Sequence, residues 1–213
     1  MNHYQDRKHA GKILAHALKA YANRDDVLVL ALPRGGVPVG FQIAKELHAP
    51  LDVFLVRKLG VPGYNELAMG AIAMGGVQVF NQDIIQRYDV SAEELTAVTE
   101  REKQELARRE KAYRNNRPLP VIKDQTIILV DDGIATGATV RVAIKALKTL
   151  KPARLVVAVP VADAVLCDTL QYEVDELVCP LQPSELNAVG AWFDDFSQTE
   201  DEEVYTLLNI SRS

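Results

Sequence analysis

The sequence predicts an α/β fold in which a parallel, twisted sheet of about five strands carries helices on both faces. Five short runs have the near-continuous hydrophobicity of strands buried on both faces, namely Val27–Leu32, Asp52–Val56, Thr126–Val130, Leu155–Val159 and Val174–Cys179. Segments with helical spacing of apolar residues lie between several of these runs. Strands that alternate with helices indicate parallel pairing, so ligands are expected at the carboxyl ends of the strands.

The helices are predicted from apolar spacing and from capping residues. Apolar side chains recur at helical intervals over Arg7–Tyr21, Val37–Leu47 and Ala138–Leu150. Ser91 and Glu94 form an S-x-x-E capping box that begins a long charged helix ending near residue 114. Its apolar stripe is thin, so we expect an insertion over about residues 91–116 that is mostly solvated or packs on a neighbouring subunit, without an evident function.

Composition and length fit one domain spanning residues 1–213. A chain that is 48% hydrophobic and 25% charged can bury a full core, which we place at about residues 5–180. The glycine-rich stretch 59–76 predicts a mobile loop or a hairpin. The tail from Gln182 onward is acidic and carries Trp192, the single tryptophan.

Charge and hydropathy exclude several classes of protein. The net charge of −5 argues against nucleic acid or an anionic membrane as a partner. No apolar run approaches the roughly 20 residues of a membrane span, and no signal peptide is visible, so a cytoplasmic location is expected. Cys167 and Cys179 lack a CxxC pattern and predict free thiols in a reducing compartment. The four histidines lack metal-ligand spacing and are interpreted as structural or solvated.

The stretch TIILVDDGIATGATV reads as a buried strand, two carboxylates, a short turn and a helix start. Gly133 and Gly137 permit backbone conformations and close approaches that a Cβ would obstruct. The N–H groups from Ala135 to Thr139 would then face outward at a helix N-terminus, where the helix dipole favours an anion. Neither GxxxxGK[ST] nor GxGxxG is present. The stretch therefore predicts a phosphate cradle of another kind.

Asp131 and Asp132 stand at the edge of this cradle, where they would repel a bare phosphate. A phosphorylated sugar accounts for them, because carboxylates accept hydrogen bonds from vicinal hydroxyls while main-chain amides hold the phosphate. The alternative is that Asp132 caps the turn and Asp131 is a solvated strand end. The strand–turn–helix context favours the sugar.

The motif VDDGIATGAT resembles the phosphoribosyl-pyrophosphate (PRPP) motif of the type I phosphoribosyltransferases. PRGGVPVG near the start and AVGAWF near the end resemble one branch of that family, and the order of elements agrees from about Asp6 to Tyr205. The resemblance implies that Asp131 and Asp132 bind the ribose hydroxyls. It implies a 5-phosphate site at Ala135, Thr136, Gly137, Ala138 and Thr139.

The resemblance also identifies PRGG as the pyrophosphate loop, with Arg34, Gly35 and Gly36 as binding residues. Arg57 and Lys58 close the second strand on the rim where pyrophosphate would lie. Guanidinium groups offer a bidentate fork for phosphate, which supports this role. A tight turn with a solvated arginine, and surface charges at a strand end, are the alternatives.

Two further segments correspond to mobile or variable parts of the family. GVPGYNELAMGA matches a flexible loop that closes over the reacting centre, where Glu66 would protonate or orient a base or would simply face solvent. Residues 181–207 match the hood that recognises the base. Its candidate contacts are Val189, Trp192, Phe193, and Asp194 or Asp195, although the aromatic side chains could instead anchor the C-terminal segment.

The implied reaction transfers the 5-phosphoribosyl group from PRPP to a nitrogen of a nucleobase-like acceptor and releases pyrophosphate. Mg²⁺ is the implied cofactor, with Asp131 and Asp132 contacting it mainly through water, and a homodimer is the family expectation. Ala135 and Ala138 replace an aspartate and a lysine of the 6-oxopurine branch, which disfavours hypoxanthine–guanine transfer by that route. A non-catalytic PRPP sensor or regulator, and a nucleotide or phosphosugar hydrolase or phosphorylase, are the alternatives.

Overall fold

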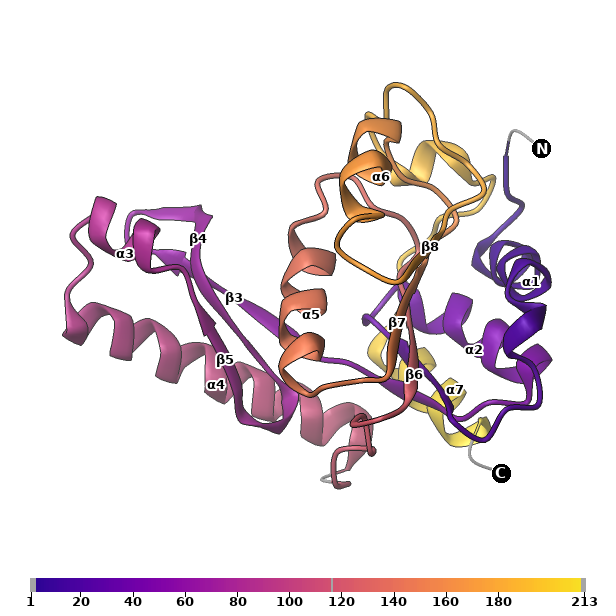
Figure 1. Cartoon of the computed structure of the whole chain (residues 1–213), viewed down its shortest axis with the longest axis horizontal. Helices are drawn as coiled ribbons and strands as arrows, with labels where there is room; N and C mark the ends of the chain where they lie inside the picture. Colours follow the sequence, from indigo (N-terminus) through magenta and orange to yellow (C-terminus); the bar gives the residue numbers. More distant parts are fainter. Residues whose placement is uncertain (1–2, 116, 212–213) are drawn as a thin grey trace.

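The computed structural model describes residues 3–115 and 117–211, and at residues 65 and 66 it describes the backbone alone. Five parallel strands form the central sheet in the order β2-β1-β6-β7-β8 (Figure 1). They are β1 (Val27–Ala31), β2 (Leu51–Val53), β6 (Thr126–Val130), β7 (Arg154–Ala158) and β8 (Glu176–Val178). Val27 pairs with Thr126, and Thr126 with Arg154, so the central strands start in register. The predicted parallel sheet is confirmed.

Helices cover both faces of this sheet, as the sequence predicted. One face carries α1 (Arg7–Ala17), α2 (Gly36–Leu47) and α7 (Asp201–Ile210); the other carries α5 (Ala138–Thr149) and α6 (Ala164–Leu170) (Figure 1). Alternate strand residues divide between the two layers: Val29 and Ile128 belong to the core under α1 and α2, and Leu28 and Ile127 to the core under α5. Every residue of β1 and β6 is buried, which explains their unbroken hydrophobic runs.

An arm, defined here as residues 56–114, projects from the sheet (Figure 1). It consists of β3 (Val56–Val61), β4 (Tyr64–Ala73), β5 (Val77–Phe80), α3 (Gln82–Arg87) and α4 (Ala92–Arg114). The three strands form an antiparallel sheet in the order β3-β4-β5, and α4 packs along β3 and β4 and reaches α7. Of the predicted alternatives for residues 59–76, the structure has the hairpin, extended by a third strand.

Several predicted boundaries were wrong. The run Asp52–Val56 is divided between the end of β2 and the start of β3, and the last strand is shorter than predicted. Helix α1 ends at Ala17 and is followed by a 3-10 turn at Lys19–Tyr21. The start of α4 was predicted correctly, since Ser91 and Glu94 form both hydrogen bonds of the capping box.

Two smaller findings concern the cysteines and the helices. Cys167 and Cys179 are both free thiols and both buried, in agreement with the prediction of free thiols. Burial raises the pKa of each thiol, so both stay protonated at neutral pH. Among the described residues, no helix combines the length and the hydrophobicity needed to cross a membrane.

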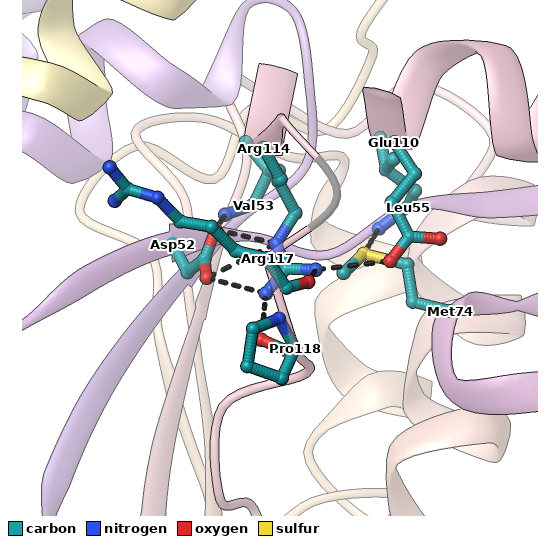
Figure 2. A network of polar contacts seen from close by, with 8 residues as sticks. All are labelled: Asp52, Val53, Leu55, Met74, Glu110, Arg114, Arg117 and Pro118. Carbon is teal, nitrogen blue, oxygen red and sulfur yellow. Dashed lines mark hydrogen bonds and ion pairs between the residues drawn. The ribbon is translucent and has the colours of Figure 1, made fainter. Parts of the chain in front are cut away.

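Arg114 joins the root of the arm to the central sheet (Figure 2). Its side chain is only 1% exposed. Nε and Nη2 lie 3.1–3.2 Å from the carboxylate oxygens of Asp52 in β2, while Nη1 and Nη2 donate to the carbonyls of Arg117 and Pro118 at 2.9 and 2.7 Å. Nη1 also contacts Glu110 at 3.0 Å. The buried guanidinium is thus surrounded by acceptors, which is the condition for burying such a charge.

Candidate functional site

The site lies where the strand order reverses. The chain moves from β1 to β2 on one side and from β6 to β7 on the other, so the loops after β1 and β6 flank a crevice at the carboxyl edge of the sheet. These loops pack closely: a Cβ at Gly35 would lie 1.9 Å from Asp132 Oδ2, and one at Gly36 would lie 2.7 Å from the carbonyl oxygen of Val130. The two glycines of PRGG are therefore needed for contact with the aspartate pair.

Two helices begin at this crevice without a capping side chain. Helix α2 follows Gly35 and α5 follows Gly137, whose φ of 76° favours glycine. The N-cap residues Gly35 and Gly137 supply no side-chain cap, and neither first turn contains an acidic residue. One contact of a side chain with these N–H groups is a long one, from the N–H of Ala138 to Thr136 Oγ1 at 3.5 Å. Thr136 in the loop before α5 and Thr139 in its first turn are exposed. Uncapped N–H groups at the positive end of a helix dipole form a site for an anion.

The aspartate pair is positioned by main chain and by an N-terminal arginine. Asp131 Oδ1 accepts a hydrogen bond from the N–H of Asp132 at 2.9 Å, and Asp132 Oδ2 lies 2.8 Å from Arg7 Nε. Arg7 also donates to the carbonyl of Ser197 at 2.6 Å and stacks 3.9 Å from the ring centroid of Phe196. Burial, and then the neighbouring charge of Asp132, raise the pKa of Asp131 well above its ordinary value.

A cavity of about 260 Å³ lies between PRGG, the start of β3 and the cradle. It is lined by Pro33 of PRGG, by Arg57 and Lys58 after β2, and by Ala138 and Thr139 of the cradle. The remaining lining residues are Val56, Arg109 and Val142. The cavity thus brings together Arg57 and Lys58 of the predicted pyrophosphate residues and Ala138 and Thr139 of the predicted 5-phosphate residues, and its cations favour an anionic ligand. Arg34, Gly35, Gly36, Ala135, Thr136 and Gly137 are not among the residues that line it.

Two predicted phosphate-binding arginines have carboxylate partners. Arg57 Nη2 lies 2.6 Å from Glu102 Oε2 of α4. Arg34 Nη1 lies 3.7 Å from both Glu200 and Asp201 at the start of α7. These side chains would have to exchange a carboxylate for a phosphate when a ligand binds.

The hood residues divide into one anchor and several open positions. Phe193 is only 5% exposed and its ring packs on Tyr4 and Phe196, with centroids 5.3 and 4.8 Å apart. The prediction that Phe193 stacks on a base is therefore wrong for this conformation, and the anchoring alternative holds. Val189 covers the cradle, because a Cβ at Gly133 would lie 2.4 Å from its Cγ1.

The other hood candidates stay closer to solvent. Trp192 is half-buried and Asp194 is exposed, 2.8 Å from His3 Nδ1. Asp195 is also exposed, and Oδ1 accepts from the N–H of Ser197 at 2.9 Å. The main chain of Tyr4 donates to the carbonyl of Trp192 at 2.9 Å, so the N-terminal segment holds the hood. A role in base binding stays a prediction for Val189, Trp192 and Asp194.

The predicted closing loop, which contains Glu66, lies in the arm. Glu66 belongs to β4, but its side chain is outside the described residues. Tyr64 follows the turn between β3 and β4 at the outer end of the arm (Figure 1), is 63% exposed and packs on Tyr88 with ring centroids 5.5 Å apart. The structure therefore places the start of β4 at the outer end of the arm, while Ala68, Gly70 and Ala71 of the same predicted loop lie beside Val142 and Lys145 of α5.

Arg7 and Arg109 were missed by the sequence analysis. A signal existed for Arg7, because a cation in the first turn of a helix opposes the helix dipole and needs a local partner. Arg109 could have been found by continuing the apolar stripe of α4: it lies three residues after Leu106 and four before Tyr113.

Comparisons with known proteins agree with this geometry. A family model described as "Phosphoribosyl transferase domain" matches residues 2–181. Two proteins from strains of Mycobacterium tuberculosis, each named "Putative phosphoribosyl transferase", are 41% identical over 209 residues, which is 98% of this chain and 47% of each relative. The chain thus spans about half the length of these curated relatives.

Solved structures give the same result for the fold. A crystal structure of a Thermus thermophilus protein is 39% identical, with a TM-score of 0.86 and 97% coverage of both chains. An Aquifex aeolicus protein is 13% identical, with a TM-score of 0.53, 86% coverage of this chain and 78% of that one; at this identity only the fold is shared.

Proposed function

Because the chain belongs to the phosphoribosyl transferase domain family, we propose that it is a PRPP-dependent phosphoribosyltransferase. It would transfer the 5-phosphoribosyl group to a nitrogen of a nucleobase-like acceptor and release diphosphate. One observation carries the proposal: an aspartate pair, an uncapped helix N-terminus and a cationic cavity adjoin in a single crevice. That arrangement matches a sugar with a phosphate at one end and a diphosphate at the other.

The ribose 5-phosphate end would be held by the loop after β6. Main-chain N–H groups from Ala135 to Thr139 would bind the phosphate, supported by the dipole of α5. Asp131 and Asp132 would accept hydrogen bonds from the two ribose hydroxyls. Arg7 contacts Asp132 directly, so it would fix the orientation of that carboxylate.

The diphosphate end would be held by Arg34, Arg57 and Lys58 with the main chain of PRGG. In the reaction the bond from the anomeric carbon to the diphosphate oxygen breaks, its electron pair leaves with diphosphate, and the acceptor nitrogen forms the new bond and then loses its proton. The cations stabilise the leaving group, and the aspartates face the positive charge that develops on the ring. The chain need not supply a covalent nucleophile.

A hydrated Mg²⁺ fits these residues. Among the described residues there is no cluster of three or more metal-ligand side chains, but Mg²⁺ usually needs only one or two carboxylates together with substrate phosphates and water. Asp131 and Asp132 supply such a pair. When bound, the ion would neutralise charge on the departing diphosphate.

The acceptor would enter on the hood side of the crevice. Val189 and Trp192 offer apolar surface and Asp194 offers a hydrogen-bond acceptor, while Phe193 serves as an anchor. Glu66 remains a candidate for orienting the base. Ala135 disfavours the 6-oxopurine route, in which an aspartate at this position accepts the proton.

The test incubates the protein with PRPP, Mg²⁺ and a panel of nucleobases and measures diphosphate release, with PRPP binding followed separately by calorimetry. Base-dependent release is expected; binding without release indicates a sensor, and base-independent release indicates a hydrolase. Asp132→Asn should abolish turnover. The matched control is Asp25→Asn, which removes the same charge just before the start of β1, at the edge of the sheet opposite the site. Asp25 is exposed there, so this variant should leave turnover unchanged. Full activity of Asp132→Asn would contradict the proposed site.

A further inference from the structure

Helix α4 presents one narrow face to the rest of the molecule. Of its buried side chains, Val98, Glu102, Leu106 and Tyr113 recur at intervals of four, four and seven residues, and Thr99 and Arg114 each lie next to a member of this series. Arg109 occupies the missing step of this series, between Leu106 and Tyr113. A cation on the inward stripe of a helix needs a partner there, because its exposure to water is reduced.

Because Arg109 lies on this inward face, its side chain reaches the cavity that Arg57 and Lys58 also line. The side chain of Arg109 is 35% exposed, against 62% for its neighbour Arg108, and Arg109 lines the same cavity as Arg57, Lys58 and Thr139. Among the described residues, none of those that line this cavity is acidic. Arg57 and Arg109 each have a carboxylate partner, Glu102 and Glu105, and neither of these is among the lining residues. An anion inside the cavity would lie close to the cations that line it and would interact favourably with them.

We propose that Arg109 is a further diphosphate-binding residue, delivered to the phosphoribosyltransferase site by the arm. The inference rests on the proposed function, and it gives the charged helix a role: α4 forms one wall of the subsite for the leaving group. Its ligand is the diphosphate of PRPP, and inorganic diphosphate after the transfer. Arg109 would bind the diphosphate in the cavity that it lines together with Arg57 and the first turn of α5.

Glu105 orients Arg109 without occupying all of its donors. Glu105, one helical turn before Arg109, accepts a hydrogen bond from Arg109 Nε on Oε1 at 2.8 Å. Both oxygens of this carboxylate also accept hydrogen bonds from Arg108. Hydrogen bonds from Arg108 and Arg109 lower the pKa of Glu105 to about 2, so this contact persists at neutral pH. The two Nη groups of Arg109 make no hydrogen bond within the described part of the chain. They are the donors available to a phosphate.

Contacts on both sides of Arg109 fix the helix against the crevice. Two turns earlier, Glu102 holds Arg57, which belongs to the same cavity. Five residues later, Arg114 is anchored to Asp52 and to the carbonyls of Arg117 and Pro118 (Figure 2). Arg109 therefore approaches from a helix that is attached to the core rather than from a free end.

The neighbouring arginine provides a matched control. Arg108→Ala and Arg109→Ala each remove one guanidinium from the same helix and from the same partner, Glu105. Calorimetry with inorganic diphosphate and Mg²⁺ should show Arg109→Ala binding at least about tenfold more weakly than wild type, since a charge-assisted hydrogen bond to phosphate is lost. Arg108→Ala should bind as wild type. Ribose 5-phosphate, which lacks the diphosphate, should bind all three proteins within about threefold.

The outcomes separate this inference from the proposed function. If wild type binds PRPP and diphosphate, and Arg109→Ala binds both equally well, the inference is overturned and the proposed function stands. Equal losses in Arg108→Ala and Arg109→Ala would also overturn it, because they would indicate a general charge effect. If wild type binds neither PRPP nor ribose 5-phosphate, both proposals fail. Arg109→Gln keeps the aliphatic stem and replaces the alanine variant if that variant does not fold.

Discussion

Replacing Arg114 by methionine tests the attachment of the arm to the sheet. Methionine keeps the apolar stem but removes the guanidinium, so the Asp52 carboxylate, whose side chain is only 13% exposed, loses its cation. Removing one partner of a buried ion pair typically costs about 3–5 kcal/mol. Asp52 keeps the hydrogen bond from the N–H of Val53 and some access to water. We therefore expect a loss of about 3 kcal/mol, or about 6–12 °C in Tm for a chain of this size.

The assay is urea unfolding followed by circular dichroism, with the midpoint and slope compared between variants. The double variant Arg114→Met with Asp52→Leu removes both charges and should be clearly more stable than the sum of the two single losses predicts. Arg108→Met is the control, since its ion pair is exposed to solvent and should contribute little to stability. A loss below about 1 kcal/mol in Arg114→Met, or strict additivity in the double variant, would refute the reasoning.

Three more predictions concern the crevice. Gly35→Ala should weaken ribose 5-phosphate binding at least about tenfold in calorimetry, because the new Cβ would lie 1.9 Å from Asp132 Oδ2; unchanged affinity would exclude the close packing of the two loops. Arg7→Ala should weaken the same binding by on the order of 1.5 kcal/mol through loss of the 2.8 Å contact with Asp132, and Arg7→Lys should restore part of it. Asp131→Asn should be more stable than wild type at pH 8 but not at pH 3, as measured by thermal unfolding. The raised pKa of Asp131 means that folding favours the protonated carboxyl, so wild type loses stability as pH rises from the unfolded-state pKa of about 3.9 toward the folded one.

The central sheet was predictable because its signals are local. Strands buried on both faces require unbroken apolar runs, and the cradle requires its glycines and uncapped N–H groups within one short segment. The strands of the arm gave no such signal: β4 reads YNELAMGAIA, and its pairing with β3 shifts register around Gly60, which disrupts the alternation expected of a strand. Helix α7 did have a readable signal in its three acidic first-turn residues and in Val204 and Leu208.

The site was predictable only where its residues are close in sequence. The aspartate pair and the cradle form one motif, and PRGG is a second. Arg7 meets Asp132 across 125 residues, and Arg109 reaches the cavity from an arm whose path depends on tertiary packing. Contacts between residues far apart in the chain leave at most an indirect signal in the sequence, such as the cation Arg7 in the first turn of a helix. The anchoring of Phe193 likewise depends on Tyr4, far away in the chain.

The arm leaves the sheet three residues after the end of β2 and returns before β6, and within the described residues its strands pair only with one another. Within the described residues, the arm therefore forms no strand pairs with the parallel sheet, although Arg57, Lys58 and Arg109 of the arm line the cavity. This makes the arm a natural unit for grafting, with Arg114 as the joint at which a graft should stop. A chimera that takes residues 57–113 from a homologous chain should keep the parallel sheet and change which leaving group or acceptor is accepted.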